Sequence, residues 1–178
     1  YLRDLKKINQ WQNVQIEQLA LSNRCGTDIL TIPAPRGVTS PVASLNQPVA
    51  LTGDFYSETV NVTTLDHYCQ KHNLAPDFIK CDVEGHEYQL FEGSASTLMR
   101  HKPTLFFECE QRHNEVRDIQ DTFAMLSRFG YDGWFFHGLN GLMPISDFRL
   151  EHHQNTTADR FWDSSDYCNN FMFMPKDQ

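Results

Sequence analysis

Apolar residues follow a helical period near the start of the chain and a strand period after it. Leu2, Leu5 and Ile8 recur at three-residue steps, which predicts a helix over residues 1–12. Apolar and polar residues then alternate through three predicted strands, residues 14–22, 28–33 and 58–63. Between the last two lies a segment rich in Pro, Gly, Ser, Thr and Asn, so we predict a loop over residues 36–53.

The rest of the chain alternates short apolar runs with segments of helical period. Thr64 is a suitable N-cap for a helix that ends at Asn73. Further helices are predicted over residues 86–101 and 116–129, and strands over 78–83, 104–107, 131–137 and 170–174. This alternation indicates a doubly wound α/β domain with a mostly parallel sheet. No clear helix precedes the last strand, so we expect it to pair antiparallel at an edge.

Length and charge restrict the fold and the partners. A chain of 178 residues predicts a single domain over residues 1–178. The net charge of −8 and the scattered Lys and Arg residues argue against a nucleic-acid partner. No apolar run reaches the roughly 20 residues of a membrane span, so we expect no membrane partner. The five cysteines form no CxxC pair and no secretory leader is visible, so we expect reduced thiols in a cytoplasmic protein.

Acidic and imidazole side chains gather just after the predicted strands, where open α/β sheets bind ligands. The residues in these positions are Ala20, Leu21, Ser22, Asp82, Glu84, His86 and Glu110. The densest group, residues 82–87, allows two interpretations. It holds either residues that act on a ligand, or a cap at Asp82 with Glu84 and Glu87 at the positive end of the next helix. These residues alone leave both open.

Two sequence motifs resemble a known family. Residues 63–69 (TTLDHYC) and 77–87 (DFIKCDVEGHE) closely resemble the signature of FkbM-type methyltransferases. Residues 102–107 and 170–175 are similar to later strands of that family. The resemblance implies a Rossmann-like sheet of the class I methyltransferase type. It also implies an S-adenosylmethionine-dependent O-methyltransferase that acts on a hydroxyl of a small metabolite or sugar.

The chain departs from the family pattern at its start. The family begins with a strand and a glycine-rich turn that holds the cofactor, followed by an acidic strand end. Nothing of that kind precedes Tyr1. We therefore predict a domain truncated at the N-terminus, with its cofactor-binding strands missing. The alternative is a non-catalytic binding or interaction domain that keeps the methyltransferase fold.

The resemblance implies roles for the residues at the strand ends. Asp82 would be the carboxylate at the transfer site and would also contact the cofactor, with His86 as general base. Glu84 and Glu110 would orient the hydroxyl acceptor. The segment Ala20, Leu21 and Ser22 would line the adenine side. Asp82, Glu108 and Glu110 could instead hold a divalent metal, but their spacing is not that of a dedicated site, so we predict none. The oligomeric state stays open.

Overall fold

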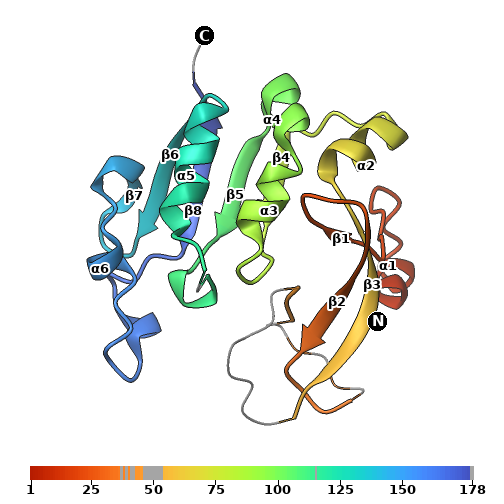
Figure 1. The fold of residues 1–178 in the computed structure, drawn as a ribbon, viewed down its shortest axis with the longest axis horizontal. Helices are drawn as coiled ribbons and strands as arrows, with labels where there is room; N and C mark the ends of the chain where they lie inside the picture. Colours follow the sequence, from red (N-terminus) through yellow and green to blue (C-terminus); the bar gives the residue numbers. More distant parts are fainter. Residues whose placement is uncertain (37, 39, 41–42, 46–53, 115, 177–178) are drawn as a thin grey trace.

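The computed structural model describes residues 1–36, 38, 40, 43–45, 54–114 and 116–176, which form two β-sheets (Figure 1). The first sheet has the order β1-β3-β2, with β1 parallel and β2 antiparallel to β3. Its strands are β1 (Ala20–Leu21), β2 (Gly26–Ile32) and β3 (Tyr56–Thr63). The predicted strand 14–22 is thus reduced to its last residues. Most of the predicted loop 36–53 lies outside the described residues.

The second sheet has five strands in the order β4-β5-β8-β6-β7. They are β4 (Phe78–Cys81), β5 (Thr104–Glu108), β6 (Tyr131–His137), β7 (Gly141–Pro144) and β8 (Asn170–Pro175). Only β4 and β5 pair in parallel, and the other neighbours are antiparallel.

The expected mostly parallel arrangement is therefore wrong, because both sheets are mixed. The last strand does run antiparallel, as predicted, but it lies inside the second sheet between β5 and β6. The edge position is taken by β7, which pairs with β6 across a short turn. This hairpin was hidden in a polar passage that shows no strand period.

The predicted helices are present with shorter bounds, and α6 is an additional helix that the sequence did not predict. They are α1 (Leu2–Ile8), α2 (Leu65–His72), α3 (Glu87–Glu92), α4 (Ala95–His101), α5 (Ile119–Arg128) and α6 (Leu150–His153). The Thr64 side chain caps α2 by accepting a hydrogen bond from His67 N at 3.0 Å. The predicted helix 86–101 is divided into α3 and α4 at Gly93 and Ser94.

The core lies between the second sheet and the helices on one of its faces, with α3 and α5 across the strands (Figure 1). Alternate residues of β5 and β8 point toward these helices, so Leu105, Phe107, Phe171 and Phe173 are fully buried. Phe123 of α5 packs against three of these rings. On the opposite face, Lys80 and Phe136 contact the Phe106 ring.

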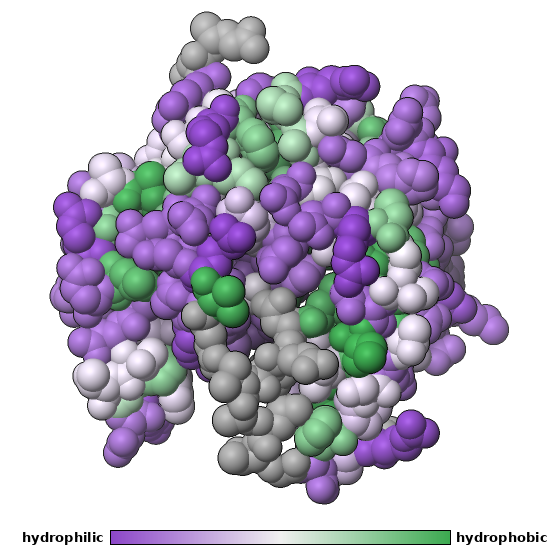
Figure 2. Space-filling model, in the orientation of Figure 1, coloured by the Kyte–Doolittle hydropathy of each residue, from purple (hydrophilic) through white to green (hydrophobic). Residues whose placement is uncertain are grey.

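Hydrophilic residues dominate the face of the molecule seen in Figure 2, with smaller hydrophobic patches between them. Among the described residues, no helix has the length and apolar character needed to cross a membrane.

Candidate active site

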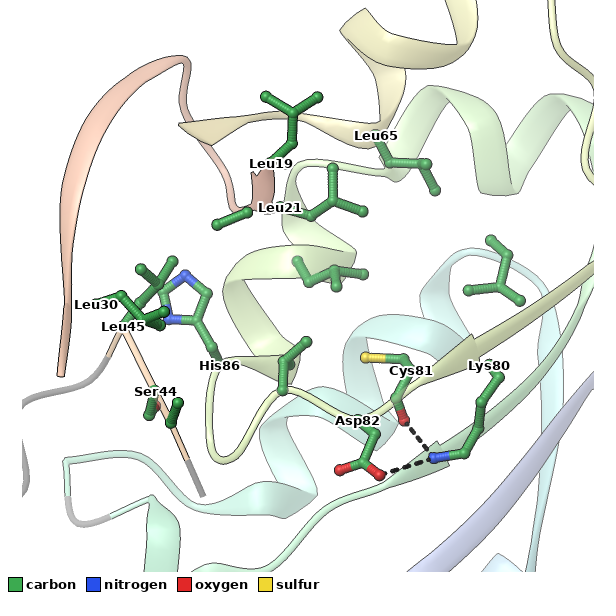
Figure 3. Close-up of a pocket in the computed structure, with 15 residues that line it drawn as sticks. Leu19, Leu21, Leu30, Ser44, Leu45, Leu65, Lys80, Cys81, Asp82 and His86 are labelled. Atoms are coloured by element: carbon green, nitrogen blue, oxygen red, sulfur yellow. Dashed lines mark hydrogen bonds and ion pairs between the residues drawn. The ribbon is translucent and has the colours of Figure 1, made fainter. Parts of the chain in front are cut away.

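A cavity of about 350 Å³ opens between the first sheet and the carboxyl end of β4 (Figure 3). Its apolar wall contains Leu19, Ala20, Leu21, Leu30, Leu65, Ile79, Val83 and Leu90. Its polar atoms come from Ser44, Lys80, Asp82 and His86. The volume lies within the range of roughly 300–1,000 Å³ that is usual for small-molecule sites. A mostly apolar cavity with a few polar groups is suited to a ligand of mixed character.

Asp82 lies where β4 ends, beside Lys80. The Lys80 Nζ atom is 3.2 Å from the Asp82 carboxylate and 3.3 Å from the Cys81 carbonyl oxygen, as Figure 3 shows. Both side chains are about half exposed, 45% for Lys80 and 49% for Asp82. Because water screens such a pair, it contributes little to folding stability. The Asp82 carboxylate is therefore accessible to a ligand.

The turn from β4 into α3 has a backbone that most residues avoid. Glu84 and Gly85 have φ angles of 51° and 88°. A Cβ atom on Gly85 would lie 2.3 Å from the His113 carbonyl oxygen, so only glycine fits there. The Gly85 N–H donates to the carboxylate of the buried Glu87 at 3.1 Å. Burial raises the pKa of Glu87. This geometry carries Asp82 and His86 to the cavity.

Four of the predicted site residues line the cavity: Ala20, Leu21, Asp82 and His86. Ser22 lies behind the lining residues, and its Oγ atom is 2.9 Å from His86 Nε2. His86 is only 7% exposed. Burial lowers the pKa of His86, which favours the neutral ring.

Glu84 and Glu110 lie outside the residues that line the cavity, in a second polar group. Arg112 binds both carboxylate oxygens of the buried Glu110, at 2.7 and 2.9 Å, and the Tyr167 hydroxyl donates to the same carboxylate. Burial acts to raise the pKa of Glu110, but the hydrogen bonds from Arg112 and Tyr167 outweigh it and lower the pKa. With its oxygens engaged in this way, Glu110 fastens the segment before β8 to the end of β5.

Glu84 is the more open carboxylate of this second group. Its Oε2 atom is 3.5 Å from His113 Nε2. Burial, and then the negative charges of Asp82 and Glu110, raises the pKa of Glu84. Burial lowers the pKa of His113.

Sequence reasoning missed Arg112 and Tyr167 as partners of Glu110. Arg112 stands two residues after Glu110 at a strand end, which is a signal that could have been used. Tyr167 lies in a polar passage without any pattern, and only the fold brings it to Glu110.

Asp82, Glu108 and Glu110, the alternative metal ligands, lie in different sets of contacts. Glu108 instead accepts a hydrogen bond from Asn169 Nδ2 at 2.8 Å. In the described part of the chain, no three or more His, Cys, Asp or Glu side chains converge in a way that could hold a metal ion.

Comparison with known proteins assigns the family. Residues 5–132 match the model of the Methyltransferase FkbM domain. The chain belongs to the FkbM methyltransferase family. The match includes β4, the cavity-lining turn and Glu110, and it ends before β7 and β8. The contact between Glu110 and Tyr167 thus joins the family region to a segment outside the match.

A solved structure is also similar to the chain. It is the crystal structure of Methyltransferase FkbM from Methylobacillus flagellatus KT, with a TM-score of 0.53 and 16% sequence identity. The likeness covers 97% of this chain and 32% of that one, so the chain spans about a third of that protein's length. At this identity it supports the mixed α/β fold. No curated protein matches the chain.

Proposed function

We propose that this FkbM family member is an S-adenosylmethionine-dependent O-methyltransferase that acts on a hydroxyl of a small metabolite or sugar. The observation that carries the proposal is the cavity at the carboxyl end of β4, because the residues 82–87 of the family motif begin there. The two mixed sheets would belong to a Rossmann-like domain of the class I methyltransferase type. In such domains, ligands bind beyond the carboxyl ends of the strands.

The cavity residues fit the proposed cofactor. Leu21, Ile79 and Leu90 offer apolar surface for an adenine ring, on the side where Ala20 and Leu21 were predicted to lie. The accessible Asp82 carboxylate complements a sulfonium cation. S-adenosylmethionine supplies a methyl group on that sulfonium. The chain therefore offers an apolar surface and an accessible carboxylate, paired with Lys80, at one cavity.

For this reaction the protein mainly has to align the methyl donor with the acceptor hydroxyl and to remove the hydroxyl proton. Asp82 is at the cavity and is open to solvent, so we assign it the carboxylate that faces the transfer site. We assign His86 as the general base, because its lowered pKa favours the neutral ring that can accept a proton. Glu84 belongs to the same turn, outside the residues that line the cavity, and is the remaining candidate to orient the acceptor. Glu110 was predicted for the same task. Because its carboxylate is bound by Arg112 and Tyr167, we assign it the role of anchoring the segment before β8.

The charge of the ligand provides the test. S-adenosylmethionine carries a sulfonium cation, while S-adenosylhomocysteine is a neutral thioether at the same atom. We expect both to bind the full-length protein in a calorimetric titration. Asp82→Asn should weaken binding of S-adenosylmethionine about fivefold more than binding of S-adenosylhomocysteine, the size expected for a half-exposed charge pair.

Asp132→Asn is the matched control. Asp132 is 56% exposed and lies 3.6 Å from Lys176, an ion pair like that of Asp82 but away from the cavity. This substitution should leave both affinities unchanged. If Asp82→Asn weakened the binding of both ligands equally, Asp82 would not be the carboxylate that faces the transfer site. If a well-folded protein bound neither ligand, the non-catalytic interaction domain would replace the enzyme as the explanation.

A further inference from the structure

The turn between β4 and α3 is fastened to the first sheet by two serine hydroxyls. Ser44 Oγ donates to the Glu84 carbonyl oxygen at 2.8 Å, and Ser22 Oγ lies 2.9 Å from His86 Nε2. The Ser44 contact holds the backbone of the turn, and the Ser22 contact holds the imidazole of His86. Both cross from the part of the chain around the first sheet to the part that carries Asp82.

Each serine is itself fixed by backbone hydrogen bonds. Ser44 pairs with Thr31 of β2 through two of these, at 2.9 and 3.1 Å. Ser22 N donates to the Thr63 carbonyl at the end of β3 at 3.0 Å. The serines therefore transmit the position of the first sheet to the turn.

The turn needs such support because its own conformation is unfavourable. Glu84 adopts a left-handed φ of 51°, and a side-chain-bearing residue pays for that conformation in free energy. Contacts from outside the turn must hold it in place. The Ser44 bond acts on the carbonyl of Glu84 itself, directly between Asp82 and His86 in the chain.

We propose that Ser22 and Ser44 are positioning residues, whose hydroxyls fix the turn and so set the places of Asp82 and His86 at the cavity. Ser22 is only 2% exposed, so it acts through His86 and does not contact a ligand. Ser44 also lines the cavity, so its effect on the turn is measured in the protein without ligand. The expected effect on cofactor binding rests on the proposed function, whereas the expected effect on the conformation of the turn does not.

Amide hydrogen exchange in the free, full-length protein tests the effect on the turn. The probe is the Gly85 N–H, which is bonded to Glu87. Ser44→Ala and Ser22→Ala should each speed its exchange about tenfold, as expected for the loss of one hydrogen bond. Ser44→Thr keeps the hydroxyl and should restore the wild-type rate. Titration of S-adenosylhomocysteine should show affinity reduced several-fold in the two alanine variants and restored in Ser44→Thr.

Ser94→Ala is the matched control. Ser94 is as buried as Ser22, but its hydroxyl donates to the Leu90 carbonyl within the helical segment. It should lower the melting temperature without changing the Gly85 exchange or the affinity. Unchanged Gly85 exchange in both Ser22→Ala and Ser44→Ala would overturn the proposal, as would an equal acceleration in Ser94→Ala. If the wild type bound no S-adenosylhomocysteine, the proposed function would fail, and the exchange rates would still decide the role of the serines.

Discussion

At the scale of single residues, close backbone contacts shape the surroundings of the cavity. Gly93, between α3 and α4, lies directly against Ser22: a Cβ atom there would be 2.1 Å from the Ser22 carbonyl oxygen. Its φ of −75° is ordinary, so the requirement for glycine is purely steric. Because Gly93 has no side chain, Ser22, which contacts His86, can approach the connection between α3 and α4. One missing side chain thus allows the end of β1 to lie directly against the connection between α3 and α4.

Replacing Gly93 with alanine should force this contact apart. We expect Gly93→Ala to lower the free energy of unfolding by about 2 kcal/mol, as overpacking of a close contact does. Denaturant unfolding followed by circular dichroism measures the change. Ser96→Ala, an exposed substitution in the same helical region, should stay within about 0.5 kcal/mol. Equal stabilities for the two variants would show that the Gly93 contact is not tight in solution.

At the scale of elements, the sequence predicted those with a strong local pattern. α2 has its cap at Thr64, and β4, β5, β6 and β8 appear where apolar runs predicted strands. β7 and α6 were missed because their residues have no clear period. The place of β8 inside the sheet was also missed, since the order of strands depends on contacts far apart in the sequence, such as Glu110 with Tyr167.

The candidate site was predicted to a similar degree. The motif at residues 82–87 identified Asp82 and His86, which line the cavity as expected for site residues, although their roles stay predictions. The division of the acidic residues into two groups could not be predicted. Glu110 follows a strand end just as Asp82 does, but Arg112 and Tyr167 draw it into a different set of contacts.

The Glu110 anchor should make stability depend on pH. The pKa of Glu110 is lowered in the folded protein from an ordinary value of 4.5. Its contribution is therefore present above about pH 4.5 and is lost as the pH falls through the folded pKa. We expect Glu110→Gln to lower the free energy of unfolding by about 1–2 kcal/mol at pH 7. The difference in stability from wild type should narrow as the pH falls below about 4.5.

Denaturant titrations of both proteins between pH 7 and pH 3 measure this difference. Asp163→Asn is the control, because Asp163 pairs with Arg160 at an exposed site. It should change stability by less than about 0.5 kcal/mol at every pH. If the stability difference between wild type and Glu110→Gln stayed constant across this pH range, the ionised Glu110 carboxylate would not be what stabilises the fold.

At the scale of the whole molecule, the cavity lies between the first sheet and β4, and several contacts join the neighbouring connections and helices. Asn23 Nδ2 donates to the Glu92 carboxylate at 2.6 Å. The Asp66 carboxylate accepts from the Ser96 and Thr97 N–H groups at the start of α4, at 3.0 and 2.7 Å. The cavity lining comes from β1 and β2 of the first sheet and β4 of the second, so a ligand held there would contact both sheets.

Photolabelling tests the central claim, that this cavity binds the methyl donor, without knowledge of the acceptor. The full-length protein would be irradiated with tritiated S-adenosylmethionine, digested and mapped. We predict label in peptides that contain residues 19–21 or 78–90, and its loss when excess S-adenosylhomocysteine is added. Label that S-adenosylhomocysteine does not displace, or displaceable label confined to residues 138–169, would contradict the account.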